Sequence, residues 1–236
     1  MKTKIKNILV VLLIITGFTA CEKDNFKAPE IMFNGRLVYQ GEKIYLEQDQ
    51  VSFELWQSGF GKYAPIKSSF NQEGEYSTTL FNGTYKFVIP MGQGPFKWNM
   101  NANGNADSLL IELNGNKSWD IEVIPFYLIK NTTLSTNGEN VSAVFDLEKV
   151  ITGAEGKNVE RVYLYINKTQ FVSGNSNSNI AQSSLSGDEL SGLSNLELSV
   201  DIPTLTPSQN YVYARVGLKI QGVEDMIFSP LKKLEF

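Results

Sequence analysis

Hydrophobic and polar residues alternate along much of the chain. Val51, Phe53 and Leu55 alternate with the side chains between them, and the same period of two recurs from Val141 to Leu147. Successive side chains of a β-strand point to opposite faces, so this spacing predicts strands with one buried face. Helical spacing with a capping residue is found in no segment of ten or more residues. The pattern therefore predicts an all-β protein.

Two turn sequences predict β-hairpins in the first half of the chain. Segments 76–80 and 85–89 are rich in β-prone residues and are joined through Asn82-Gly83, which tolerates the positive φ angles of a tight turn. Segments 109–113 and 119–123 flank a second Asn- and Gly-containing turn. We expect the two segments of each pair to lie side by side in one sheet.

The pattern after Pro125 predicts a second β domain. The run Val159–Ile166 is almost continuously β-branched or aromatic, as in a central strand. Tyr211, at the start of a further strand, resembles the tyrosine corner of immunoglobulin-like and fibronectin type III sandwiches, in which the hydroxyl bonds back to the backbone. Segment 173–194, rich in Ser, Gly and Asn, is predicted to be a long loop, either a simple insertion or a binding loop. We therefore predict two tandem β-sandwich domains, at residues 31–125 and 126–236.

The N-terminus has the features of an export signal. Lys2, Lys4 and Lys6 precede an apolar run of eleven residues, Ile8–Phe18. Because a membrane-spanning helix needs about 20 apolar residues, this run predicts a secretory signal peptide. The segment Phe18-Thr19-Ala20-Cys21 resembles a bacterial lipobox, in which cleavage precedes the cysteine and the thiol carries a diacylglycerol.

Cys21 is the only cysteine, and its position favours lipidation; the alternative is an ordinary signal peptide that leaves a free thiol. We expect a signal peptide at 1–20 and a lipidated tether at 21–30, with acyl chains that hold the protein in the outer membrane. Residues 22–24, Glu-Lys-Asp, are similar to signals that send certain Gram-negative lipoproteins to the cell surface. A short solvated linker is the alternative.

Composition limits the chemistry. The sequence contains no histidine and one cysteine, which excludes Ser-His-Asp and Cys-His nucleophiles, a histidine base and a Cys/His zinc site. The formal net charge is −4 and the isoelectric point is about 5.1, so no overall basic field attracts nucleic acid. Asp120 and Glu122 share the polar face of one strand, where like charges usually serve solubility. We expect no enzyme activity, no catalytic residue and no cofactor.

Aromatic residues beside polar ones are the candidate ligand contacts. Trp98 and Phe96 lie in a segment rich in Gly and Pro, and Trp56 lies opposite the apolar face of its strand. An exposed flat ring stacks on the C–H face of a sugar, while amides such as those of Asn99 and Asn101 bind hydroxyl groups. The alternative is that Phe96 and Trp98 fold back as a lid over one open end of the sandwich.

Two further signals lie close to this segment. Asn99–Asp107 has the opening spacing of a calcium loop, but its first ligand positions are neutral amides and Leu110 takes the place of the bidentate Glu, so we expect no metal site. Asp107-Ser108-Leu109 resembles the Asp-Ser/Thr-apolar signal for O-glycosylation in some anaerobic Gram-negative bacteria. Ser108 is therefore a candidate modification site, with a chance match as the alternative.

Turns and core strands carry a family resemblance. The segments concerned are Gly35–Val38, Gly41–Ile44, Val51–Trp56, Gly74–Tyr76, Leu80–Tyr85, Asn131-Thr132, Lys168–Val172 and Tyr213–Gly217. The first five resemble the carboxypeptidase-regulatory or transthyretin-like sandwich. Together the segments resemble the two-domain lipoproteins of domain-of-unknown-function family 3823. The resemblance implies a transthyretin-like first domain and an immunoglobulin- or fibronectin type III-like second domain, and it transfers no catalytic residue.

The same resemblance implies a location and a role. Members of that family are typically surface lipoproteins of anaerobic polysaccharide-degrading bacteria, often encoded beside outer-membrane glycan importers and their sugar-capturing lipoprotein partners. We expect a non-catalytic surface lipoprotein that is accessory to glycan capture and import, with a polysaccharide, an importer and a sugar-capturing lipoprotein as candidate partners. The alternative is a structural or docking module of an importer or adhesive assembly that binds no glycan.

Overall fold

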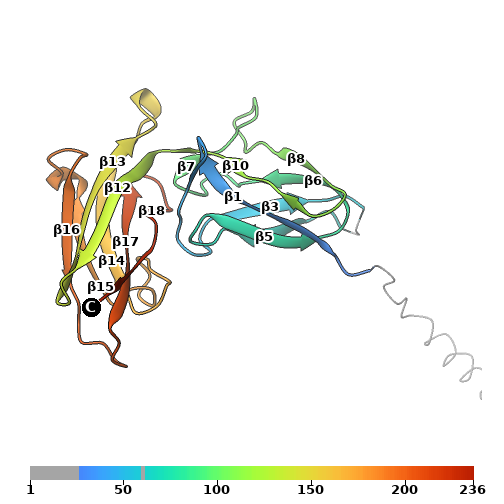
Figure 1. The fold of residues 1–236 in the computed structure, drawn as a ribbon. Coiled ribbons are helices and arrows are strands. Elements are labelled where there is room, and N and C mark those ends of the chain that lie inside the picture. Colours follow the sequence, from blue (N-terminus) through green and yellow to red (C-terminus); the bar gives the residue numbers. More distant parts are fainter. Residues whose placement is uncertain (1–26, 60–61) are drawn as a thin grey trace, which may run out of the picture.

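The computed structural model describes residues 27–59 and 62–236. The predicted signal peptide, Cys21 and the first part of the predicted tether lie outside the described residues. Within them, no helix is both long enough and apolar enough to cross a membrane. The described chain forms two β-sandwiches whose strands run in different directions in Figure 1, so the sandwiches meet at an angle. The prediction of an all-β protein with two domains is confirmed.

The first sandwich packs two sheets against each other. In one sheet, β1 (Ile31–Tyr39) is central: it pairs antiparallel with β2 (Glu42–Lys43) and β5 (Glu75–Leu80), and parallel with β9 (Lys117–Ser118) and β10 (Ile121–Glu122). The other sheet has the order β4-β3-β6-β8, with bounds Pro65–Ser69, Ser52–Trp56, Gly83–Val88 and Leu109–Leu113.

The alternating pattern of β3 fills the core of this sandwich. Phe53 and Leu55 are fully buried, as is Val51 just before the strand. The ring of Phe53 stacks on Phe87 of β6 with 4.9 Å between centroids and lies 5.0 Å from Phe70. Several large rings in contact stabilise the two layers beyond their buried area alone.

Both predicted hairpins are wrong. β5 pairs with β1, whereas β6 pairs with β3 and β8, so the turn at Asn82-Gly83 carries the chain from one sheet to the other. Likewise β8 pairs with β6, whereas β9 and β10 pair with β1. The Asn-Gly sequence does permit the positive φ of Gly83, which is 141°. Turn chemistry allows the chain to reverse, but the core decides which strands pair.

The second sandwich contains longer strands. One sheet has the order β12 (Tyr127–Thr136), β13 (Asn140–Lys149), β16 (Leu196–Asp201). The other has the order β15 (Ala181–Ser186), β14 (Val159–Asn167), β17 (Tyr211–Ile220), β18 (Ile227–Phe228), with β19 (Lys232–Glu235) also on β17. The predicted central strand is confirmed, because β14 has a neighbour on each side. Two 3₁₀ turns, Gly153–Glu155 and Gly187–Glu189, lie in the connections.

Two other predictions for this domain fail. Segment 173–194 is not one long loop, because it contains edge strand β15, which pairs with β14 over six residues, and a 3₁₀ turn. The Tyr211 hydroxyl makes no hydrogen bond to another described residue; the Lys233 ammonium instead lies 4.3 Å from the centre of its ring. The tyrosine-corner bond is found in the first domain, where the Tyr85 hydroxyl donates to the Phe81 carbonyl at 3.0 Å.

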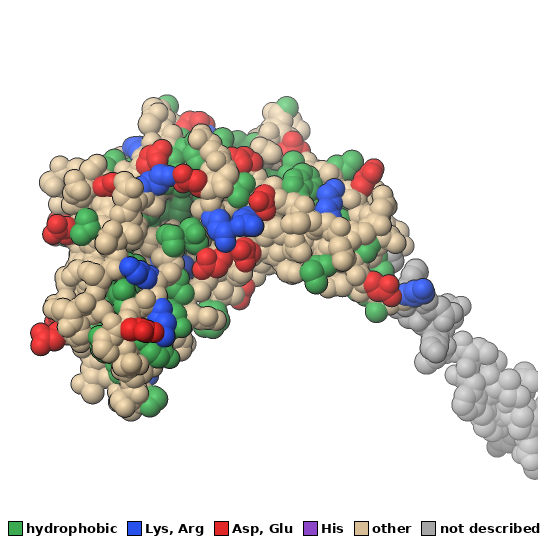
Figure 2. Space-filling view, in the orientation of Figure 1, with side chains coloured by type: hydrophobic (Ala, Val, Ile, Leu, Met, Phe, Trp, Pro, Cys, Tyr) green, Lys and Arg blue, Asp and Glu red, His purple; other side chains and the backbone are tan. Residues whose placement is uncertain are grey.

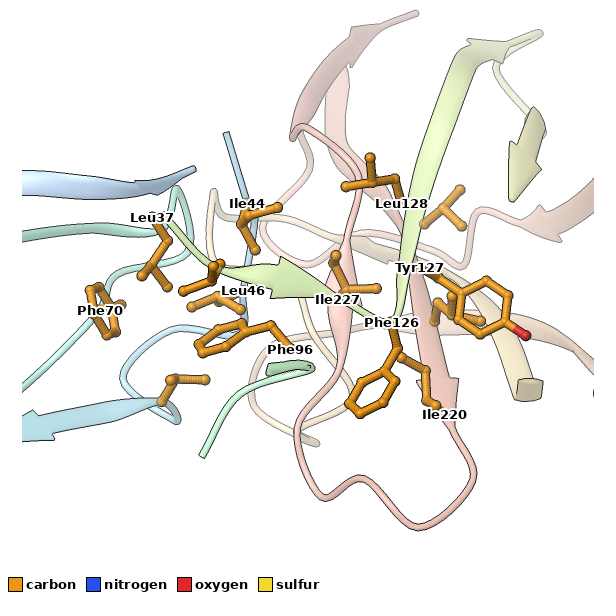
Figure 3. Packing of buried hydrophobic residues seen from close by; sticks show 14 of the residues in the cluster. Leu37, Ile44, Leu46, Phe70, Phe96, Phe126, Tyr127, Leu128, Ile220 and Ile227 are labelled. Carbon is orange, nitrogen blue, oxygen red and sulfur yellow. The ribbon is translucent and has the colours of Figure 1, made fainter. Parts of the chain in front are cut away.

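The two domains share a continuous hydrophobic contact (Figure 3). In Figure 3, Ile44, Leu46 and Phe96 lie on the side of the first domain nearest Ile227 and Phe126 of the second. One buried cluster includes these residues together with Leu37 and Phe70 of the first domain and Tyr127, Leu128 and Ile220 of the second. The short strands β7 (Phe96–Lys97) and β11 (Ile124–Pro125) pair beside this contact. The chain therefore passes between the domains through packed structure rather than a free linker.

A buried arginine crosses this junction. Arg215 of β17 is 1% exposed; its Nε donates to the Val172 carbonyl, and its Nη1 donates to the Leu46 carbonyl of the first domain at 2.9 Å. Its guanidinium carbon lies 3.8 Å from the centre of the Phe228 ring. Burial lowers the pKa of the Arg215 guanidinium, and the nearby Glu47 carboxylate opposes that shift. The Nη2 atom has no partner among the described residues.

Polar contacts surround the buried part of the junction. The Phe228 amide donates to the Tyr45 carbonyl at 3.0 Å, and the Gly94 amide donates to Asp225 Oδ2 at 2.7 Å. Burial raises the pKa of the Asp225 carboxyl. The Lys130 ammonium lies 2.5 Å from a Glu42 carboxylate oxygen across the junction. Figure 2 shows acidic and basic side chains next to one another where the domains meet. These contacts fix the relative orientation of the two sandwiches.

Candidate functional site

An aromatic side-chain pair lies on the outer face of the β4-β3-β6-β8 sheet. Trp56 of β3 pairs in register with Pro65 of β4 and Lys86 of β6, and Lys86 pairs with Leu110 of β8. Residues paired directly across strands point to the same face. Tyr63 contacts Trp56 with 5.1 Å between ring centroids. We call these five residues the aromatic platform.

The platform is accessible and its tryptophan is oriented. Tyr63 is 54% exposed and Leu110 is 63% exposed. The Trp56 indole N–H donates to Glu54 Oε2 at 3.0 Å, and the Lys67 ammonium lies 3.7 Å from the other oxygen of that carboxylate. These contacts hold the indole while leaving charged groups beside it. The arrangement is suited to a sugar, whose C–H face stacks on aromatic rings and whose hydroxyl groups bind to ammonium and carboxylate groups.

Trp98 lies on the opposite side of the same sheet. Its ring lies 6.0 Å from that of Phe87, a fully buried residue whose neighbour Lys86 belongs to the platform. Its indole N–H donates to the Asp107 carbonyl at 2.9 Å. Phe96 is 5% exposed and packs in the core near the domain junction. The structure therefore does not bring Trp56 and Trp98 together, and both Phe96 and Trp98 pack against the core in the way expected of a lid.

Asn99 and Asn101, the two amides predicted beside Trp98, make different hydrogen bonds in the loop. Asn99 is exposed, and its backbone carbonyl accepts from the Asp107 amide at 2.8 Å. The side-chain oxygen of Asn101 accepts from the backbone amides of Asn103 and Asn105 at 3.0 and 3.2 Å, so that oxygen serves the turn. The described residues contain no group of three or more His, Cys, Asp or Glu placed to hold a metal ion.

Ser108, the predicted modification site, is half-buried and directly precedes β8. Its backbone amide donates to Asp107 Oδ1 at 2.8 Å. Its modification stays a prediction.

Two features of this domain are not among those predicted from the sequence. Tyr63 joins the platform because the chain returns from β3 to β4, a contact for which spacing alone contains no signal. A polar groove of about 540 Å³ lies over the outer face of the other sheet, between Asn34, Ser77 and Ser118. These residues come from three strands that are far apart in the sequence, although each occupies a polar position in an alternating pattern, which is a signal of exposure.

Three solved structures share this two-domain architecture. A DUF3823 family protein from Parabacteroides merdae ATCC 43184 is 30% identical with a TM-score of 0.74, over 89% of this chain and 100% of that chain. A second from Bacteroides ovatus ATCC 8483 is 27% identical with a TM-score of 0.72, over 87% and 99%. A Bacteroides uniformis ATCC 8492 protein, described as a candidate carbohydrate-binding protein, is 16% identical with a TM-score of 0.68 over 89% and 100%, which shows the shared fold alone.

Family models match both halves of the chain. The model described as the N-terminal domain of the protein of unknown function DUF3823 matches residues 31–124. The model described as domain of unknown function DUF3823_C matches residues 127–233. Among curated proteins the chain has no match. The two models together span nearly all of the chain that the structure describes, and the chain therefore belongs to the DUF3823 family.

Proposed function

We propose that this protein is a non-catalytic surface lipoprotein that binds glycan and is accessory to its import. The observation that carries the proposal is the aromatic platform, where Trp56 and Tyr63 lie in contact on an open sheet face beside Glu54, Lys67 and Lys86. A flat face of this kind fits an extended sugar chain better than a small enclosed ligand. The structural similarity to a candidate carbohydrate-binding protein agrees with the proposal.

Binding without catalysis is supported by the residues available. The chain has no histidine, and Glu54, the carboxylate beside the Trp56 indole, is engaged with Trp56 and Lys67. On the other sheet, Asp120 lies 3.5 Å from Arg36, and Glu122 accepts from the backbone amide of Gln40 at 2.6 Å. A glycosidase instead needs two carboxyl groups that face each other across a cleft, about 5–10 Å apart.

The location follows from the N-terminal sequence. Lipidation of Cys21 places several acyl chains in the outer membrane, and the tether then presents the first domain outside the cell. Incorporation of labelled palmitate into the parent but not into Cys21→Ala is expected. Protease added to intact cells is expected to remove the protein. Absence of label, or protection from protease in cells whose periplasmic proteins are also protected, contradicts this location.

A glycan array tests the binding proposal. The mature protein in detergent is probed against neutral and acidic polysaccharides, and affinities of the positive ones are measured by calorimetry. We expect Trp56→Ala to weaken binding about tenfold or more, the effect of losing about 1.4 kcal/mol of contact energy. Phe171→Ala, which removes a 45% exposed ring from the second domain, is the matched control and is expected to bind as the parent does.

The same measurements place the site. If Trp98→Ala, rather than Trp56→Ala, abolishes binding, the ligand contacts the loop side and the platform is the wrong surface. Parent-like affinity in both variants would remove both aromatic candidates.

A docking role is the second candidate. The platform also exposes Tyr63 and Leu110, at 54% and 63%, and exposed apolar side chains in one region can mark a protein interface. Silence across the glycan array at millimolar sensitivity, together with an outer-membrane importer that co-purifies with the parent but not with Leu110→Asp, would favour docking over glycan capture.

A further inference from the structure

A polar groove crosses the outer face of the sheet opposite the aromatic platform. Its floor is formed by paired positions: Asn34 of β1 lies in register with Ser77 of β5 and Ser118 of β9, and Arg36 lies in register with Glu75. The volume of this open groove is about 540 Å³. That volume lies within the range of small-ligand sites, roughly 300–1,000 Å³.

The chain approaches itself closely beneath the groove. A Cβ added to Gly35 would lie 1.9 Å from the Trp119 carbonyl oxygen, so only glycine lets the backbone at 119 cross β1 there. The Tyr76 hydroxyl donates to the same carbonyl at 2.7 Å, and burial raises the pKa of Tyr76. The floor is therefore built from fixed backbone, and the side chains above it are held at defined positions.

Three polar side chains that face the groove have no hydrogen-bond partner among the described residues. The side chains of Asn34, Ser77 and Ser118 make no hydrogen bond to another described residue, and Ser77 is exposed. The amide of Asn34 and the hydroxyl groups of the two serines can each donate and accept hydrogen bonds, so they can bind the hydroxyl groups of a sugar. Across the groove, the edge of the other sheet adds the Ser69 hydroxyl, which donates to Asp49 Oδ1 at 3.0 Å.

The charges of the groove select against anions. Its lining holds three carboxylates, Asp49, Glu75 and Asp120, and one cation, Arg36, which lies 3.5 Å from Asp120. Lys43 approaches Glu75 from outside at 3.2 Å. With both cations counted, one negative charge is in excess. A uronate or a sulfated sugar would meet like charge here, whereas uncharged hydroxyl groups would meet both donors and acceptors.

We propose that this groove is a binding site for a neutral oligosaccharide. The proposal rests on the proposed function for the glycan class and adds a second contact surface on the opposite face of the first domain. Because Tyr76, the aromatic residue of the lining, is 3% exposed, recognition is by hydrogen bonds rather than by ring stacking.

The test combines ligand charge with matched variants. Mature protein in detergent is titrated with neutral gluco-, manno-, xylo- and galacto-oligosaccharides and with oligogalacturonate and heparin oligosaccharides. The double variant Asn34→Ala/Ser77→Ala removes two unpaired polar groups, and Thr79→Ala, further along the same face of β5, is the control. We expect the double variant to lose about tenfold in affinity for a neutral oligosaccharide, as two lost hydrogen bonds imply, and Thr79→Ala to match the parent.

Each outcome decides a separate point. Parent-like neutral-glycan affinity in the double variant overturns the groove, while loss of binding in Trp56→Ala still supports the proposed function. Anionic oligosaccharides that bind the parent and not the double variant overturn the selection for neutral sugars. No oligosaccharide bound by the parent overturns both proposals. Circular dichroism and the unfolding midpoint of the double variant are expected to match the parent, because both side chains are unpaired on an outer sheet face.

Discussion

Replacing Arg215 by methionine is expected to weaken the coupling between the two domains. Methionine keeps an apolar stem next to Phe228 but cannot donate to the carbonyls of Val172 and Leu46. A hydrogen bond from a charged group contributes about 1.5–3 kcal/mol, so the pair contributes about 3–6 kcal/mol. The substitution also removes a buried charge and the unpaired Nη2 donor, and this gain cancels about 1–3 kcal/mol of the lost hydrogen-bond energy. The expected loss in free energy of unfolding is therefore about 2–3 kcal/mol.

The positions of the tryptophans allow the unfolding of the first domain to be followed separately from that of the whole protein. All three, Trp56, Trp98 and Trp119, lie in the first domain, so their fluorescence reports its unfolding, whereas far-ultraviolet circular dichroism reports both domains. In urea we expect the two signals of the parent to change together. In Arg215→Met we expect separate transitions, with the first midpoint about 1–1.5 M lower if the slope is ~2 kcal/mol per M.

A surface arginine of the same sheet supplies the control. Arg161 is partly exposed and donates to the Ser184 hydroxyl at 3.3 Å, so Arg161→Met is expected to stay within about 0.5 kcal/mol of the parent. A buried charge can also be replaced by an apolar residue without loss. If Arg215→Met unfolds at or above the parent's midpoint with coincident transitions, the Arg215 hydrogen bond to Leu46 does not couple the domains and the reasoning is refuted.

Three further measurements follow from the first domain. Gly35→Ala is expected to lower the free energy of unfolding by about 3 kcal/mol, because the new Cβ meets the Trp119 carbonyl at 1.9 Å, whereas Gly115→Ala, with open space around it, stays near the parent in urea titration. Burial raises the pKa of Tyr76 from 10.0, so above pH 10 the unfolded chain loses the phenol proton before the folded one and the free energy of unfolding is expected to fall. In Tyr76→Phe we expect the free energy of unfolding to fall less steeply with pH in this range. Intact mass of native protein tests glycan on Ser108: a sugar mass absent from Ser108→Ala supports modification, and an unmodified mass contradicts it.

Strand positions were accessible to sequence analysis where one face of the strand is buried. Val51, Phe53 and Leu55 lie in the core as their alternation predicts, and Trp56 lies on the outer face for the same reason. Strand pairing was not accessible. The turn at Asn82-Gly83 has the same local chemistry whether the next strand joins the same sheet or the facing one, and burial of two core faces against each other selects the second outcome.

The candidate sites show the same division. Sequence analysis found Trp56 as an outward ring but grouped it with Trp98, because nothing in local spacing says on which side of a sheet a later loop will pack. The polar groove depends on Asn34, Ser77 and Ser118, which are brought together only by the register of three strands. Arg215 occupies an outward position of its strand, and it is buried because the first domain covers that face.

What the sequence determined by itself is the β class, the two-domain organisation and the exclusion of histidine and cysteine chemistry, since these depend on the strand pattern and on composition. What only the tertiary structure decided is which strands pair, which aromatic rings stay exposed and how the domains join. Those outcomes depend on contacts between residues far apart in the chain, and their free energy is gained only when whole faces are buried together.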